Sequence, residues 1–191
     1  MTTRWLLAMT TFLVVACASK EILPEHSAIV PVGVDLSGQW VLRKDSGDTN
    51  RRLNEAEQMA AGGRDDILAR PQQNTSRKRP GSLVHVFLET GTNLKITQTA
   101  DGLFISFDRA IVEEYIFGEY TQVSVGPVVA SRSSGWEQQA YVIETLDKDG
   151  NKLIERYQLG DNVQLLIRQI TLYKNRKVDL SLVQRFDRRD G

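Results

Sequence analysis

Adjacent acidic residues are the first candidates for chemistry in this sequence. Glu113 and Glu114 are neighbours, and Glu119 follows shortly after them. General acid–base catalysis by two carboxylates requires both groups to reach the same substrate. Successive residues on a β-strand point to opposite faces, so Glu113 and Glu114 are not expected to act together. A hydrolase that uses carboxylates is therefore the least favoured of three functions that the sequence suggests.

A second candidate is the run Asp147, Asp149 and Asn151, which imitates the start of a calcium-binding loop. A loop of that kind has glycine at its sixth position and glutamate at its twelfth. Counted from Asp147, these positions hold Lys152 and Gln158. The same run is typical of a hairpin turn, and we expect a turn without a metal ion.

The remaining catalytic patterns are missing from the sequence. His26 and His85 have no cysteine or carboxylate at ligand spacing, and there is no Gly-rich phosphate loop or Gly-x-Ser-x-Gly elbow. The 191 residues include 24 Lys and Arg against 24 Asp and Glu, a balance that argues against nucleic-acid binding. We expect a protein that is not an enzyme and that binds no metal, cofactor or nucleic acid.

The first residues have the pattern of a targeting signal. Arg4 precedes a mostly apolar run over 5–15, and small residues follow it. A run of this length is too short to cross a bilayer as a helix, which takes about 20 residues. A positive charge, a short apolar run and small residues are typical of a secretory signal peptide, which we expect over 1–16.

The end of this signal resembles the lipobox of bacterial lipoproteins. Val14-Val15-Ala16 precedes Cys17, which is the only cysteine in the chain. The resemblance implies cleavage before Cys17 and attachment of acyl chains such as palmitate to that residue. Ala18 stands where lipoproteins of the inner membrane typically carry Asp, so the resemblance favours the bacterial outer membrane, with the domain facing the periplasm. The alternative is an ordinary signal peptide with an incidental cysteine.

The segment over 17–35 contains Pro24 and Pro31 and shows no periodicity, so we expect a lipidated tether. In the alternative, the apolar pairs over 29–30 and 32–34 dock on the domain. The domain is expected over 36–191, beginning with a strand over 36–42.

A polar excursion over 44–82 is expected after the first strand. It contains a possible helix over 51–60 and a loop over 71–80. The basic run Arg77, Lys78 and Arg79 lies in this loop and is a possible partner contact, although three charges in a loop are more often only solvated. The stretch 82–89 fits a short helix slightly better than a strand.

The rest of the chain alternates like a series of strands joined by turns. The expected strands cover 94–99, 103–107, 111–117, 120–129, 136–146, 152–159, 163–172 and 178–183, with a Ser/Gly turn at 131–134. Successive hairpins imply antiparallel pairing, and such a meander tends to close so that its first strand pairs near its last. We therefore expect a mainly β protein, an antiparallel up-and-down barrel of about eight strands. A two-sheet sandwich is the alternative.

Several of these strands resemble lipocalin-like bacterial envelope proteins. The carrying stretches are LSGQWVL at 36–42, LKITQT at 94–99, WE at 136–137 with VIET at 142–145, DGNKLIERYQL at 149–159 and RFD at 185–187. The resemblance implies a lipocalin-like barrel. It assigns no catalytic residues, and this chain departs from the family pattern at Arg43 and at 138–139.

A barrel of this size either holds one small ligand or is filled by side chains. The aromatic residues that could line a cavity are Trp40, Tyr115, Phe117, Trp136, Tyr141 and Tyr157. The leading hypothesis is a lipid-anchored binding protein for a small hydrophobic ligand or an envelope protein. The alternative is a structural or assembly accessory of an envelope complex, in which the interior is filled and no cavity exists.

Overall fold

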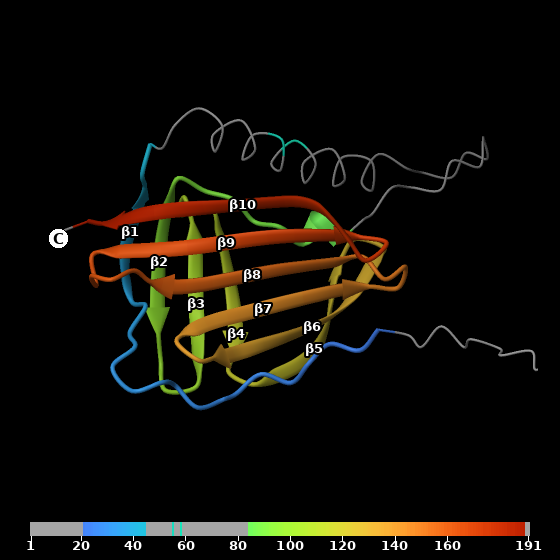
Figure 1. The fold of residues 1–191 in the computed structure, drawn as a ribbon, viewed down its shortest axis with the longest axis horizontal. Coiled ribbons are helices and arrows are strands. Elements are labelled where there is room, and N and C mark those ends of the chain that lie inside the picture. The colour runs from blue at the N-terminus through green and yellow to red at the C-terminus, as the bar shows by residue number, and fades with distance from the viewer. Residues whose placement is uncertain (1–20, 45–54, 56–57, 59–83, 190–191) are drawn as a thin grey trace, which may run out of the picture.

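The computed structural model describes residues 21–44, 55, 58 and 84–189. Within these residues the chain forms ten antiparallel strands and one turn of 3₁₀ helix (Figure 1). The elements are β1 (Gly38–Leu42), η1 (Val84–Phe87), β2 (Asn93–Gln98), β3 (Gly102–Phe107), β4 (Ile111–Ile116), β5 (Glu119–Val125), β6 (Val128–Glu137), β7 (Ala140–Asp147), β8 (Lys152–Leu159), β9 (Leu165–Lys174) and β10 (Lys177–Arg188). The expectation of a mainly β, antiparallel barrel is confirmed.

The strands form one sheet in the order β4-β3-β2-β1-β10-β9-β8-β7-β6-β5. The first strand pairs with the last, as expected, with Trp40 opposite Arg188 and Leu42 opposite Phe186. In Figure 1, β7 to β10 run nearly horizontally while β2 and β3 run nearly vertically, so the twisted sheet folds over on itself. The edges are β4 and β5, which follow one another in the chain but do not pair, and the barrel is therefore nearly closed.

The expected count of about eight strands was too low, because the region 120–146, expected to hold two strands, holds three, β5 to β7, joined by two hairpin turns. The stretch 120–129 turns at 126–127, where Gly126 has φ 55°. The stretch 136–146 turns at Gln138, a residue with φ 55° that is not a typical turn former. Primed turns need positive φ, which Gly supplies readily and Gln only under tertiary constraint.

The Ser/Gly turn expected at 131–134 is also wrong. These residues lie inside β6 and pair with both neighbouring strands. Ser133 is buried under the segment 21–35, where its hydroxyl donates to the carbonyl oxygen of Pro24, and Ser134 is buried on the opposite face, where its hydroxyl donates to that of Ile116. The short helix expected over 82–89 is present as η1, whose Val84, Val86 and Phe87 are buried.

The segment 21–35 is not the extended tether expected from its sequence. It lies along the outer face of β6 and β7 as a strap, and Leu23 is buried there. The backbone of Ser27 forms two hydrogen bonds with that of Trp136, of 3.1 and 2.8 Å, where β5 no longer pairs with β6. Of the apolar residues proposed to dock, Val34 is buried, whereas Ile29 and Val32 are exposed.

A glycine of β6 makes the close approach of the strap possible. A Cβ atom on Gly135 would lie 2.7 Å from the carbonyl oxygen of Ser27 and 2.8 Å from Cβ of His26. Gly118, at the β4–β5 turn, leaves similar room for Ala28. Because the strap covers its outer face, β7 is buried along all eight residues.

Several expectations lie outside the described residues: the signal peptide over 1–16, Cys17, and the basic run Arg77, Lys78 and Arg79. Of the helix expected over 51–60, only Glu55 and Gln58 are described, and both are helical and exposed. Among the helices that the structure does describe, none is long and apolar enough to cross a membrane.

Candidate ligand-binding interior

The inward-facing side chains form two apolar clusters, one at each end of the barrel. The first, the aromatic cluster, contains all six residues proposed from the sequence to line a cavity: Trp40, Tyr115, Phe117, Trp136, Tyr141 and Tyr157. Four of their rings meet edge to face, with the Tyr141 centroid 5.3 Å from Trp136 and 5.5 Å from Phe117. The second cluster lies beneath η1 and includes Val86, Leu153 and Ile170.

A layer of polar side chains separates the two clusters. Along β9 the inward residues are Leu166, Arg168 and Ile170, so the arginine lies between the aromatic cluster and the η1 cluster. Gln184 on β10 is the register partner of Arg168, and Glu155 on β8 lies diagonally from it, opposite Ile170. The register of the sheet therefore brings these three polar side chains within reach of one another.

Arg168 is the centre of this polar layer and is fully buried. Its guanidinium donates to the Glu155 carboxylate, to Gln184 Oε1 at 3.2 Å and to the carbonyl oxygen of Glu89 at 2.7 Å. The Tyr157 hydroxyl also donates to Glu155, at 3.0 Å. A buried charge is tolerable only when it is paired and hydrogen-bonded, and Arg168 meets both conditions.

A second arginine continues the layer toward the unpaired strand edges. Arg132 on β6 donates to Thr145 Oγ1 and to the Glu113 carboxylate of β4, both at 3.2 Å. Ser134 Oγ donates to the carbonyl oxygen of Ile116, at 3.1 Å. These side-chain contacts join β4 to β6 across the seam between β4 and β5, where the backbone ladder is missing.

Three buried donors of the interior have no hydrogen-bond partner among the described residues: Trp136 Nε1, the Tyr141 hydroxyl and Gln184 Nε2. Ser134 lies beside the Tyr141 hydroxyl, and its own hydroxyl donates to the carbonyl oxygen of Ile116. Leaving a buried donor unsatisfied costs about 1–3 kcal/mol. The interior therefore offers unused hydrogen-bonding capacity beside its aromatic rings.

The other residues that were considered as candidates for chemistry lie apart from one another. Glu113 contacts Arg132, whereas Glu114 is exposed, so the adjacent pair is divided between the two faces as expected. The Asp147 carboxylate accepts hydrogen bonds from the backbone of Asp149 and Asn151, as a hairpin turn requires. Among the residues the structure describes, no three His, Cys, Asp or Glu side chains gather to hold a metal ion.

Sequence reasoning missed one histidine contact and the whole polar layer. The side chain of His26 in the strap is buried against the sheet, with Nε2 3.7 Å from the carboxylate of Glu144, a residue far away in the sequence. The sequence does contain a signal for the polar layer: a polar residue at an inward position of an expected strand, as at Arg168, Glu155 and Gln184. That pattern identifies polar residues that will be buried, but it does not say which of them contact one another.

Neither a protein-family model nor a curated protein matches this chain. Among solved structures, it is similar to a fatty acid binding protein of Schistosoma mansoni in complex with arachidonic acid, with 11% identity, a TM-score of 0.49 and coverage of 81% of this chain and 96% of that chain. A secretory abundant heat soluble protein of Ramazzottius varieornatus has 10% identity, a TM-score of 0.48 and coverage of 81% and 95%.

A luciferase domain of the dinoflagellate Lingulodinium polyedrum is also similar, with 14% identity and a TM-score of 0.49, over 87% of this chain and 45% of that one. At these identities and TM-scores, the similarities assign neither a ligand nor an activity to this chain.

We predict that removing one member of the Arg168–Glu155 pair destabilises the protein strongly. Glu155→Leu leaves the Arg168 guanidinium buried without its counter-charge, and Arg168→Met leaves the Glu155 carboxylate buried without its own. Each variant should lower the free energy of unfolding by about 3–5 kcal/mol. The double variant should recover most of this loss. Urea unfolding of the three variants measures it. The exposed pair Arg43–Asp187 is the control and should contribute less than about 1 kcal/mol. If the single variants of the buried pair also lost less than about 1 kcal/mol of unfolding free energy, the pair would not be the stabilising contact proposed here.

We further predict a loss of stability in alkaline solution. Burial raises the pKa of Tyr115, Tyr141 and Tyr157 above the ordinary value of 10.0. The folded state therefore favours the protonated hydroxyls, and their contribution is complete below about pH 10 and declines as the pH rises above it. At pH 11 each tyrosine should lower the free energy of unfolding by about 1.4 kcal/mol.

Urea unfolding between pH 8 and 11 tests this expectation. Tyr141→Phe should remove about a third of the decline, whereas Tyr120→Phe, at an exposed position on β5, should leave it unchanged. Ionisation of all five tyrosines near pH 10 in the folded protein would show that the three are not protected.

Proposed function

We propose that the barrel binds a small, mainly apolar molecule that carries a hydrogen-bond acceptor. The observation that supports this proposal is the set of orphaned donors at Trp136, Tyr141 and Gln184. An acceptor oxygen of a ligand would satisfy one or more of them, and the rings around it would contact the apolar part. Ligand sites commonly combine such an apolar lining with a few oriented polar groups.

The contacts within the aromatic cluster favour its end of the barrel as the binding region. Trp136 and Tyr141 lie on the neighbouring strands β6 and β7 as register partners, and both side chains face inward. Two of the three unused donors therefore lie side by side. The third, Gln184 Nε2, lies in the polar layer that bounds the cluster. A ligand here would contact rings on one side and polar groups on the other.

The seam between β4 and β5 is the proposed entry route. No backbone hydrogen bonds join these two strands, so they can separate without breaking a ladder. The described polar contacts across the seam are the Arg132–Glu113 pair and the Ser134–Ile116 bond. The rings of Tyr115 and Phe117 also contact those of Tyr141 and Trp136 across it. None of these contacts is a backbone ladder, and the proposed entry opens at the two polar contacts.

The alternative, a structural or assembly accessory with a filled interior, is favoured by a different observation. The six aromatic residues are almost completely buried by one another and by their neighbours, and Arg168 uses its donors on protein acceptors. Under this alternative the orphaned donors remain unsatisfied and the protein acts through its surface. Binding to the interior distinguishes the two functions.

We predict that Tyr141→Phe weakens ligand binding without lowering stability. The hydroxyl has no partner among the described residues, so its removal should leave the free energy of unfolding unchanged or slightly higher. The probe is 1-anilinonaphthalene-8-sulfonate, whose rings are apolar and whose sulfonate accepts hydrogen bonds. Its affinity, measured by fluorescence titration, should fall about tenfold through loss of one donor.

Tyr120→Phe is the matched control, because it removes the same hydroxyl from the exposed face of β5. It should bind the probe like the unmodified protein. Native mass spectrometry of the detergent-released protein would then identify co-purifying molecules. Failure of the folded protein to bind the probe, together with no co-purifying small molecule, would favour the filled interior.

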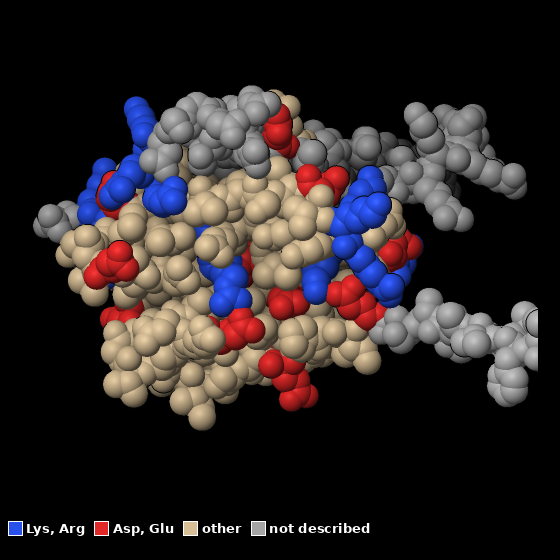
Figure 2. Space-filling view, in the orientation of Figure 1, with Lys and Arg blue, Asp and Glu red and all other residues tan. Residues whose placement is uncertain are grey.

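We also propose that the protein is anchored by lipid on Cys17 in the outer membrane of a bacterium, with the domain facing the periplasm. Only residues 18–20 separate Cys17 from the described strap, a span of at most about 14 Å from Cys17 to residue 21. An anchor there would hold the barrel at the membrane surface. Figure 2 shows Lys and Arg interspersed with Asp and Glu on a largely uncharged face, so the lipid and not the overall charge would provide attachment.

We predict that Cys17→Ser abolishes membrane attachment. The unmodified protein should resist extraction by high salt and require detergent, because several acyl chains anchor it. The variant should be recovered as an unprocessed or soluble species, and mass spectrometry of the mature N-terminus should show an acylated cysteine only in the unmodified protein. Complete release of the unmodified protein by salt alone would exclude the anchor.

A further inference from the structure

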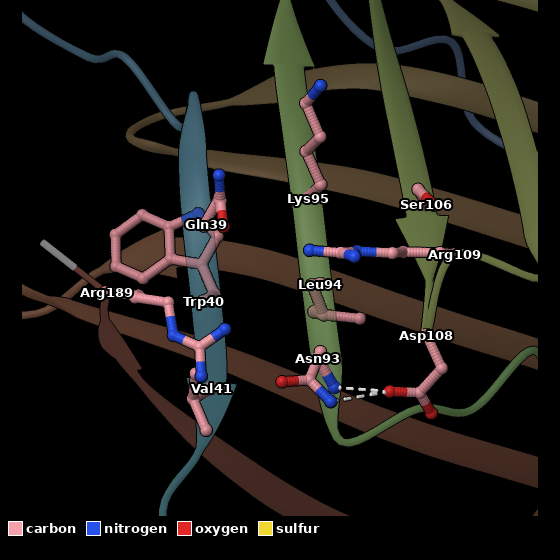
Figure 3. Close-up of a pocket in the computed structure, with 10 residues that line it drawn as sticks. All are labelled: Gln39, Trp40, Val41, Asn93, Leu94, Lys95, Ser106, Asp108, Arg109 and Arg189. Carbon is pink, nitrogen blue, oxygen red and sulfur yellow. Dashed lines mark hydrogen bonds between the residues drawn. The ribbon is translucent and has the colours of Figure 1, made fainter. Parts of the chain in front are cut away.

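A groove of about 530 Å³ lies on the outer surface of the barrel over β1, β2 and β3, away from the interior described above (Figure 3). Its floor is formed by the neighbouring strands β1 and β2, which pair in register with Trp40 opposite Leu94. The polar residues around it are Gln39, Asn93, Lys95, Ser106, Asp108, Arg109 and Arg189. A groove of this volume accommodates a small molecule.

Three cations reach this groove from separate parts of the chain. Lys95 stands on β2, Arg109 belongs to the β3–β4 turn, and Arg189 follows β10. All three residues are exposed, and none forms an ion pair with an acidic residue in the described part of the chain. In Figure 3, the Arg109 side chain extends from its turn toward β2, and the Arg189 guanidinium lies over β1. The two guanidinium groups therefore approach the groove from opposite sides.

The single acidic residue of the groove, Asp108, is already engaged. Its carboxylate accepts hydrogen bonds from the backbone N–H groups of Thr92, at 3.0 Å, and Asn93, at 2.8 Å, and from Asn93 Nδ2 at 2.9 Å. Partial burial would raise the pKa of Asp108, but these hydrogen bonds outweigh it and lower the pKa below its ordinary value. Asp108 is thus committed to holding the β3–β4 turn.

The turn that Asp108 holds also determines where Arg109 lies. Asp108 and Arg109 have φ of 48° and 62°, the left-handed region that non-glycine residues seldom adopt. Ala110 closes the turn with a 3.0 Å hydrogen bond from its N–H to the carbonyl oxygen of Phe107. The structure therefore keeps an exposed arginine in an unusual backbone conformation at the rim of a cationic groove.

We infer that this groove binds the phosphate group of a small phosphorylated molecule. A guanidinium donates two parallel hydrogen bonds to phosphate, and the two guanidinium groups and one ammonium make the groove net positive even with the Asp108 carboxylate counted, opposite in sign to a phosphate monoester or diester. Gln39 and Ser106 present polar groups for hydroxyls attached to that phosphate. Both a soluble phosphorylated sugar and the headgroup of an anionic lipid carry this chemistry.

Isothermal titration of the mature protein in neutral detergent tests the inference and separates the two sources. The probes are inorganic phosphate, glucose 6-phosphate and dihexanoyl phosphatidylglycerol. The expected result is saturable one-site binding of at least one probe. Preference for glucose 6-phosphate would indicate a soluble ligand, and preference for the short-chain lipid would indicate a headgroup. Absence of saturable binding by all three probes would overturn the inference.

The test variant is Arg109→Asn combined with Arg189→Gln, since Asn tolerates the left-handed conformation at position 109. It should weaken binding about tenfold or more. Lys174→Gln with Lys177→Gln is the matched control. It removes two exposed cations that flank the β9–β10 turn, which Figure 1 places on the other side of the molecule from β1 and β2. The control should bind within about twofold of the unmodified protein.

Equal weakening in the two double variants would overturn the inference, because it would show a general effect of surface charge. Lys95→Gln provides a second groove variant that leaves the β3–β4 turn untouched, and it should also weaken binding. Tyr141→Phe should have no effect on the binding of inorganic phosphate or glucose 6-phosphate, which have no apolar part for the interior, so the groove and the proposed interior site can fail independently.

Discussion

The pairing of β1 with β10 brings together the two ends of the domain and so gives all the strands a common interior. Trp40 and Phe186 face inward on these strands and lie in the aromatic cluster together with residues of β3, β7 and β9. Alternation along each strand then places every second side chain inside. Without this pairing the sheet would expose two more edges, and the buried charges of its concave face would be left in contact with water.

Closure of the barrel buries the polar layer, whose charged groups are stable in the interior only if they are paired. Arg168 and Glu155 come from neighbouring strands and lie at the same depth, where the low dielectric makes an unpaired charge very costly. Pairing, the Tyr157 hydroxyl and the carbonyl oxygen of Glu89 satisfy the two groups. A layer of this kind fixes the register of β8, β9 and β10, because a one-residue slip would place these charges on the opposite face.

The strap and the seam are two responses to the same incomplete closure. β5 ends before it reaches the level of Trp136, which leaves one backbone N–H and one C=O of β6 unpaired on that side, and Ser27 fills this position. Nearer the middle of the barrel, β4 and β5 remain unpaired, and the Arg132–Glu113 side-chain pair joins β4 to β6 instead. The strap thus stabilises one end of the opening, while the rest of the seam keeps the freedom that ligand entry would use.

Local patterns in the sequence determined much of the fold. Alternation identified most of the strands, and Asp-Gly and Asn-containing runs located the turns near residues 101 and 149. The aromatic residues that were proposed to line a cavity lie in the interior. Each of these inferences depends on residues close in the chain, because the two-residue period of a strand and the φ preference of a turn are local properties.

Only the tertiary structure decided the remaining features. The strap could not be distinguished from a tether, because its docking depends on Gly135 and on where β5 stops. The turn at Gln138 has no local signature. The meeting of Arg168 with Glu155, and of Arg109 with Arg189 around one groove, depends on strand register and barrel closure. These are contacts between residues distant in the chain, and their energies are set by which strands pair, a choice that no short window of sequence contains.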